Sequence, residues 1–167
     1  DVPVPPTIKV TIADQIYIDR SELPSAMIAQ LVRLAAFQNP EFYRAQAMRL
    51  PTFGKPRIVS CTELHPRHVA LPRGSFDEVV GFLSDHGVTA ELDDLREDGT
   101  RLPETVCFRG ELRQQQSRAF EALAEHDTGV LAATTAFGKT VVASALIARR
   151  ASNTLVLVHR RELLGQW

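Results

Sequence analysis

The stretch Ala133-Thr-Thr-Ala-Phe-Gly-Lys-Thr140 decides the fold predicted for the C-terminal part of the chain. An apolar run at residues 130–133 leads into it, and helical periodicity follows over residues 138–150. Gly-Lys-Thr between a strand and a helix is typical of a phosphate-binding loop, in which amides at the helix N-terminus hold an anion. Three of the four fixed positions of that pattern are present, and Ala133 replaces its first glycine. A helix start with an ordinary surface lysine is the alternative.

The residues on either side of this loop predict a βαβ unit. A helix over 114–125 comes first, and two almost wholly apolar runs, 130–133 and 154–158, enclose the helix at 138–150. Strands of this kind are typical of a parallel sheet that is buried on both faces. The sequence therefore predicts an α/β domain over residues 105–167. Because the chain starts without Met and stops just after the second run, we expect a fragment that holds only the beginning of this domain.

The first 104 residues have a different pattern and contain all ten prolines. Alternating apolar residues over 8–18 predict two strands around a turn near Asp14. Helices are expected after Pro24, after the cap Asn39-Pro40 and after the capping box Ser75-Phe-Asp-Glu78. Further strands are expected at 57–61, 68–71 and 88–92. These elements predict a small α+β domain at residues 1–104.

Composition excludes several classes of protein. With 44% hydrophobic and 23% charged residues, the chain has an ordinary globular composition and disorder is disfavoured. No apolar run approaches the roughly 20 residues that cross a bilayer, and no signal peptide is present, so we expect a cytoplasmic protein without a membrane partner. The two cysteines, Cys61 and Cys107, form no Cys-x-x-Cys pair and indicate no disulfide framework.

Three segments in the same order and spacing resemble superfamily 2 helicases. Leu112-Arg-Gln-Gln-Gln116 is similar to the Leu/Ile-Arg-Pro-x-Gln motif of that superfamily, with Gln114 in place of Pro. Residues 133–140 resemble motif I. Leu155-Val-Leu-Val-His-Arg-Arg-Glu-Leu-Leu-Gly-Gln-Trp167 resembles motif Ia of the DEAD/DEAH and type III restriction subunit branch. The resemblance covers about residues 109–167 and implies the start of the first RecA-like domain.

The phosphate loop and this resemblance together predict a site for ATP and Mg²⁺. Lys139 is expected to reach the β- and γ-phosphates and the Thr140 hydroxyl to ligate Mg²⁺, which makes them the predicted catalytic residues. The resemblance implies that Gln116 reads the adenine edge and that Arg113 lies near the base. A surface arginine is the alternative for Arg113. The predicted nucleotide-binding residues are Arg113, Gln116, Thr135, Ala136, Phe137, Gly138, Lys139 and Thr140.

Basic residues in two places predict contacts with nucleic acid. The resemblance implies that His159, Arg160 and Arg161 hold the backbone of a strand, which arginine does without reading its sequence. A solvated basic helix start is the alternative.

In the first region, Arg44, Arg49, Lys55 and Arg57 alternate with the aromatic side chains of Phe42, Tyr43 and Phe53. That mixture suits phosphate contact combined with base stacking. Burial of Phe42 and Phe53 in the core, with the charges facing water, is the alternative. The segment around these residues resembles the one before the helicase core in bacterial TOTE conflict proteins, which pair a helicase with a primase-like domain. Small α+β domains also precede the core in xeroderma pigmentosum B-type helicases, where they engage DNA.

The predicted function is ATP-dependent movement along nucleic acid, DNA rather than RNA, by a longer parent protein. The resemblance implies that hydrolysis needs an Asp-Glu pair and an arginine finger from a second RecA-like domain, so the fragment alone is expected to be inactive. A primase or nuclease domain is a further expected partner. One alternative is a nucleic-acid-binding module with a vestigial loop, marked by Ala133 and Phe137, and another is a P-loop kinase or other NTPase. Zinc binding by Cys61, His65 and His68 is disfavoured because a structural site needs four ligands.

Overall fold

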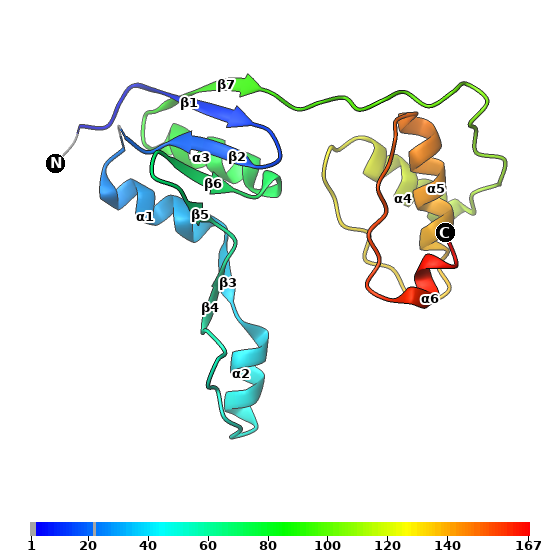
Figure 1. Cartoon of the computed structure of the whole chain (residues 1–167), viewed down its shortest axis with the longest axis horizontal. Coiled ribbons are helices and arrows are strands. Elements are labelled where there is room, and N and C mark those ends of the chain that lie inside the picture. Colours follow the sequence, from blue (N-terminus) through cyan, green and yellow to red (C-terminus); the bar gives the residue numbers. More distant parts are fainter. Residues whose placement is uncertain (1–2, 22) are drawn as a thin grey trace. The chain divides into compact units, whose positions relative to one another are not determined.

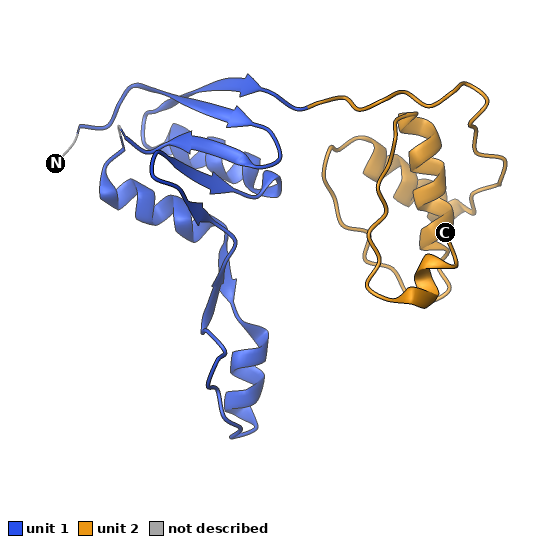
Figure 2. Cartoon of the chain, in the orientation of Figure 1, with its two compact units in different colours: residues 1–96 blue, residues 97–167 orange. Residues whose placement is uncertain are grey.

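The chain forms two compact units, residues 1–96 and residues 97–167, which Figure 2 colours separately. A computed structural model describes residues 3–21 and 23–167. Together the elements make a chain of mixed α/β class (Figure 1). Within the described residues, no helix combines the length and apolar character that crossing a membrane requires.

A five-stranded sheet forms the centre of unit 1, and its strand order is β5-β6-β2-β1-β7. The strands are β1 (Thr7–Ile12), β2 (Ile16–Asp19), β5 (Glu63–Leu64), β6 (His68–Leu71) and β7 (Thr89–Asp94). β1 pairs with β7 in parallel, and the other neighbours are antiparallel. The predicted hairpin around Asp14 and the strands at 68–71 and 88–92 are therefore confirmed, with shifts of one or two residues at their ends.

The core of unit 1 lies between this sheet and two amphipathic helices, α1 (Ser25–Leu34) and α3 (Phe76–Asp85). Along β1, Ile8 and Val10 are buried whereas Thr7 and Lys9 are exposed, so one face of the sheet is apolar. Met27 and Leu31 of α1, with Val79 and Leu83 of α3, pack against that face. Apolar side chains that alternate along the strands thus pack against apolar side chains that recur every three to four residues on the helices.

Unit 1 also contains a segment that lies apart from its sheet, and we call residues 36–60 the arm (Figure 1). Strands β3 (Ala36–Gln38) and β4 (Ile58–Ser60) pair antiparallel, and helix α2 (Pro40–Ala47) lies between them in sequence. Asn39 caps α2 as predicted, because its side-chain oxygen accepts a hydrogen bond from the backbone N–H of Glu41 at 3.0 Å. β3 was not predicted, since three residues leave no readable periodicity.

The capping box predicted for residues 75–78 is wrong. Arg73–Ser75 forms a 3-10 turn that runs directly into α3. Ser75 therefore has φ −92° and ψ 15° instead of the extended backbone of an N-cap, and its side chain makes no capping hydrogen bond. Helix α3 itself begins at the predicted place.

Unit 2 consists of three helices joined by long extended segments. These are α4 (Gln114–Ala124), α5 (Lys139–Arg150) and α6 (Arg161–Leu164). Residues 97–104, predicted as part of the first region, group with unit 2, because the Leu102 N–H donates to the Ala151 carbonyl and the Asn153 N–H to the Thr100 carbonyl, both at 2.8 Å.

The two strands predicted at 130–133 and 154–158, and with them the parallel sheet of a βαβ unit, are absent from the described part of unit 2. Both segments are irregular in structure, and neither pairs with another strand. Several of their apolar side chains are largely exposed: Val130 is 92% exposed and Leu157 84% exposed. The reason is physical, since strand hydrogen bonds need a neighbouring backbone, and apolar character alone supplies none.

The sheet core predicts a large effect of truncating Ile18, which is fully buried on β2. We expect Ile18→Ala to lower the free energy of unfolding of unit 1 by about 2–5 kcal/mol, through lost burial and a residual cavity. Urea unfolding followed by circular dichroism measures this loss. Leu64→Ala, at a side chain 57% exposed on the same sheet, is the control and should change stability little. Equal effects of the two variants would contradict this description of the core.

An ion pair at the end of β7 predicts an unusual titration. Side-chain and backbone hydrogen bonds from Arg96 lower the pKa of Asp94 to about 2. Since the folded pKa lies below the ordinary value of about 3.9, the pair stabilises unit 1 above that value, and its contribution is lost as the pH falls toward 2. We expect Arg96→Ala to return the Asp94 pKa toward its ordinary value in an NMR titration, with the unaltered chain as the reference. An unchanged Asp94 pKa would contradict the assignment.

Candidate functional site

The loop at residues 133–140 turns sharply into α5. The Phe137 N–H donates to the Thr134 carbonyl at 3.3 Å, and both Ala136 (φ 64°) and Gly138 (φ 92°) have left-handed backbone conformations. Gly138 is required here for two reasons. A side chain would strain this backbone, and a Cβ at position 138 would lie 2.4 Å from Gln116 Nε2.

This turn leaves backbone donors unused at the start of α5. Within the described chain, the N–H groups of Ala136, Gly138, Lys139 and Thr140 have no hydrogen-bond acceptor. They lie at the positive end of the helix dipole. Unpaired N–H groups in such a position are suited to bind an anion.

Lys139 extends back over the loop. Its ammonium donates hydrogen bonds to the carbonyl oxygens of Ala133 (3.0 Å) and Thr134 (2.9 Å). The positive charge therefore lies at the bend itself, next to the carbonyl groups of Ala133 and Thr134. Thr134 was not among the predicted site residues, because its contribution is a carbonyl group that any residue type could supply.

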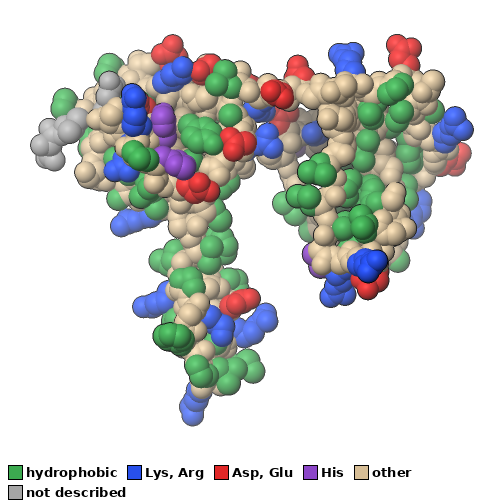
Figure 3. Space-filling model, viewed as in Figure 1, with side chains coloured by type: hydrophobic (Ala, Val, Ile, Leu, Met, Phe, Trp, Pro, Cys, Tyr) green, Lys and Arg blue, Asp and Glu red, His purple; other side chains and the backbone are tan. Residues whose placement is uncertain are grey.

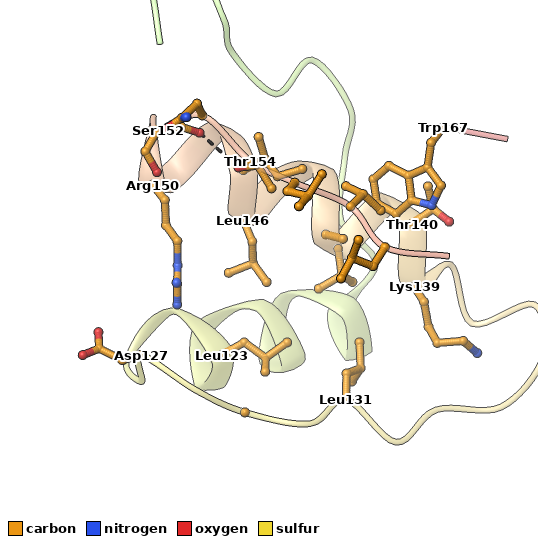
Figure 4. Close-up of a pocket in the computed structure, with 18 of the residues that line it drawn as sticks. Leu123, Asp127, Leu131, Lys139, Thr140, Leu146, Arg150, Ser152, Thr154 and Trp167 are labelled. Atoms are coloured by element: carbon orange, nitrogen blue, oxygen red, sulfur yellow. Dashed lines mark hydrogen bonds between the residues drawn. The ribbon is translucent and has the colours of Figure 1, made fainter. Parts of the chain in front are cut away.

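Thr140 follows in the first turn of α5, and its side chain is half-buried. Its hydroxyl accepts a hydrogen bond from Gln166 Nε2 at 3.5 Å. Figure 4 shows Trp167, next to Gln166 in sequence, alongside Thr140. Gln166 is a contact that the sequence reasoning missed, since no local pattern joins two residues 26 positions apart.

The carbonyl of Phe137 connects the loop to α4. Gln116 Nε2 donates to it at 2.8 Å, and the Arg113 guanidinium donates to the same oxygen. Gln116 is 96% buried, and its Oε1 accepts from the Arg113 N–H at 2.9 Å. Arg113 and Gln116 therefore hold the loop against the N-terminus of α4. Because both ends of the Gln116 amide have protein partners here, its reading of adenine remains a prediction.

A cavity of about 340 Å³ opens beside this contact. Its walls are the N-terminal turn of α4 and the loop, namely Arg113, Gln114, Gln115, Gln116, Thr134, Thr135, Ala136 and Phe137. Five of the eight predicted nucleotide-binding residues thus surround one hollow: Arg113, Gln116, Thr135, Ala136 and Phe137. Its volume is at the small end of the range for ligand sites.

A second cavity, of about 810 Å³, is mainly apolar (Figure 4). Leu123 of α4, Leu146 of α5 and Leu131 line it, together with the extended segment at 154–157. Lys139 and Thr140 lie at its edge, and the Lys139 side chain is directed away from Leu123 and Leu146 in Figure 4. The charged end of the loop therefore borders this apolar hollow.

The predicted nucleic-acid residues fall into two groups on different units. His159, Arg160 and Arg161 are all exposed at the start of α6 in unit 2. Arg44, Arg49, Lys55 and Arg57 all belong to the arm of unit 1, where Figure 3 shows basic and apolar side chains together. Of the two aromatic residues that could have been core, Phe53 is 99% exposed, so that alternative is wrong for Phe53. Phe42 is half-buried, with the Arg57 guanidinium 5.8 Å from its ring centre.

Among the described residues, no cluster of three or more His, Cys, Asp or Glu side chains has the arrangement to hold a metal ion. The donor expected for Mg²⁺ is a single hydroxyl, that of Thr140. Such a site needs phosphate oxygens of the nucleotide and water molecules for its other ligands, which is how Mg²⁺ is usually bound in nucleotide sites.

Comparison with protein families gives a match to the type III restriction enzyme res subunit over residues 109–167. This match supports a relationship of that segment to superfamily 2 helicases and a helicase or ATPase type of function in general. Proteins of this type use ATP and Mg²⁺ and interact with nucleic acid, which agrees with the loop geometry. Comparisons with curated proteins and with solved structures give no match.

The loop geometry predicts that Gly138 cannot be replaced without loss of stability. We expect Gly138→Ala to cost about 1–3 kcal/mol, because it strains a left-handed residue and pushes Gln116 off the Phe137 carbonyl. Urea unfolding followed by fluorescence of Trp167, the single tryptophan, reports on unit 2. Gly165→Ala is the matched control, since Gly165 has no left-handed backbone and only one atom within 4 Å of an added Cβ. A Gly138→Ala variant as stable as Gly165→Ala would refute the proposed constraint.

Proposed function

We propose that the protein is part of an ATP-dependent nucleic-acid helicase or translocase, and that unit 2 binds ATP with Mg²⁺ at residues 133–140. The observation that carries the proposal is the loop itself. It combines four unused backbone N–H groups with the Lys139 ammonium at the bend. The family match over residues 109–167 favours a motor over a kinase or another P-loop NTPase.

Each residue has a defined part in this proposal. The amides of Ala136, Gly138, Lys139 and Thr140 would hold the β- and γ-phosphates together with the Lys139 ammonium, which would exchange its two carbonyl acceptors for phosphate oxygens. The Thr140 hydroxyl, once released by Gln166, would ligate Mg²⁺, and the ion would neutralise charge on the phosphates. The base occupies the cavity beside Arg113 and Gln116.

Arg113 and Gln116 act on the phosphates indirectly in this scheme. They fix the Phe137 carbonyl, and so the direction in which the next amide, that of Gly138, points. A base that engaged Gln116 would have to compete with the Phe137 carbonyl for Nε2. Base binding and loop position are then linked through one side chain.

Movement along nucleic acid is assigned to a longer parent protein. In the proposal, His159, Arg160 and Arg161 contact the phosphates of a strand, DNA rather than RNA. A carboxylate pair and an arginine finger, which hydrolysis requires, come from the remainder of the helicase core, with its second RecA-like domain. Resemblance to the xeroderma pigmentosum B and TOTE branches suggests unit 1 as an accessory domain and a primase or nuclease as a further partner.

Titration of the chain with a fluorescent ATP analogue tests the nucleotide site. We expect Mg²⁺-dependent binding that Lys139→Ala weakens at least tenfold, since a charge-assisted hydrogen bond contributes about 1.5–3 kcal/mol. Thr140→Ala should remove the dependence on Mg²⁺, and Thr140→Ser should retain it. Lys9→Ala, an exposed lysine on unit 1, is the control and should bind as the unaltered chain does.

Binding that is absent, or independent of Mg²⁺ and Lys139, would refute the proposal and favour a vestigial loop.

The same proposal predicts the outcome of an ATP hydrolysis assay. The 167-residue chain should hydrolyse no ATP, whereas the parent should show turnover that nucleic acid stimulates and Lys139→Ala abolishes.

A further inference from the structure

The arm of unit 1 is held together by its own hydrogen bonds. β3 and β4 pair at its base, and Asn39 joins the two sides above them. The Asn39 N–H donates to the Arg57 carbonyl at 2.9 Å, and its Nδ2 donates to the Pro56 carbonyl at 2.8 Å. Asn39 is itself buried. The segment between β3 and β4 therefore has a fixed path although it lies apart from the main sheet.

The tip of the arm, residues 48–55, is also ordered by backbone contacts. The Leu50 N–H donates to the Ala45 carbonyl at 2.8 Å, and the Lys55 N–H closes a turn onto the Thr52 carbonyl at 3.0 Å. Gly54 has the left-handed backbone that this turn requires (φ 74°). An ordered turn presents whatever side chains it carries in a defined direction.

Those side chains are apolar and have nothing to cover them in unit 1. Phe53 is 99% exposed, Met48 63% and Leu50 52%. Phenylalanine is normally among the most buried residues, and a cluster of large exposed apolar side chains on an ordered element marks an interaction surface. The tip is therefore built to contact a partner.

Charge identifies the chemistry of that partner. The arm carries four basic residues, Arg44, Arg49, Lys55 and Arg57, against one acidic residue, Glu41. Within the described chain, none of the four basic side chains forms a salt bridge. Arg49 and Lys55 belong to the tip itself, next in sequence to its apolar residues. An anionic partner with flat apolar groups satisfies both features, and a nucleic-acid strand with accessible bases is such a partner.

We infer that the tip of the arm binds single-stranded nucleic acid, with Phe53 stacked on an unpaired base and Arg49 and Lys55 in contact with phosphates beside it. Bases in a duplex have both faces covered by their neighbours, so the tip should prefer single strands. This inference deepens the proposed function and rests on it for the class of partner. To the proposed function, the inference adds a contact of the apolar residues of the tip with bases and a preference for unpaired bases.

Fluorescence anisotropy of a labelled oligothymidylate with the 167-residue chain tests the inference. We expect Phe53→Ala to weaken binding about tenfold, which is within the range measured for one base-stacking contact. The salt dependence should stay the same, because no charge is lost. Phe53→Trp should retain binding, and its added tryptophan fluorescence should be quenched by the stacked base.

Arg49→Ala and Lys55→Ala should act differently from Phe53→Ala. Each should lower the slope of log affinity against log salt concentration by about 0.7, the value for one phosphate contact on a single strand. Leu64→Ala, an exposed apolar residue on the sheet of unit 1, is the control for loss of apolar surface and should leave binding unchanged. Circular dichroism confirms that each variant is folded.

The inference is overturned if the chain binds no oligothymidylate, if Phe53→Ala binds as the unaltered chain does, or if Leu64→Ala weakens binding equally. Tighter binding of a duplex of the same length also overturns it. Binding to anionic lipid vesicles is measured as well. If Phe53→Ala loses binding to the vesicles and keeps binding to the oligonucleotide, the tip contacts a membrane instead. A parallel titration with oligouridylate distinguishes RNA from DNA as the source of the strand. The ATP-analogue titration is independent, so failure at the tip and failure at the nucleotide loop are separately visible.

Discussion

The contact of the Phe137 carbonyl with Gln116 of α4 and with Arg113, the residue before that helix, is the constraint on which the candidate site depends. Arg113 and Gln116 both donate to this oxygen, and Gln116 is held in turn by the Arg113 backbone. With the carbonyl fixed, Gly138 must take a left-handed backbone before α5 can start. That conformation leaves the first amides of α5 without acceptors, beside Lys139. The buried Gln116 amide thus holds the loop from which these N–H groups project.

Unit 2 contains more apolar surface than its own helices cover. α5 buries Val142 and Ala145, yet Val130, Leu155 and Leu157 remain largely exposed on segments that have no strand partner. Burial of such residues would stabilise the unit by roughly 1.5–3 kcal/mol each. The loop and the helix after it are formed without that contribution, because their geometry depends on local hydrogen bonds and on packing of α4 against α5.

Unit 1 shows the opposite balance. Its core lies between the sheet and the helices α1 and α3, where β1, β2 and β6 bury apolar side chains. The arm differs from this main body. Its tip is ordered although Phe53 is exposed, and within the described chain Arg49 and Lys55 form no salt bridge. A surface that contributes nothing to the stability of its own unit is best explained by contacts outside it. The two units therefore offer separate chemistry, a phosphate loop on one and an apolar, basic tip on the other.

The sequence by itself predicted several local elements and the candidate site residues. The Asn39 cap, the amphipathic α1 and α3, and the Gly-Lys-Thr turn into α5 could all be read directly, since each depends on residues a few positions apart. Tertiary structure decided what depends on distant residues. It left 130–133 and 154–158 without strand partners, joined Gln116 to Phe137 and Gln166 to Thr140, and placed Phe53 in solvent rather than in the core. The physical reason is that strand pairing and burial are properties of neighbours in space, and an apolar residue does not specify which neighbours it will have.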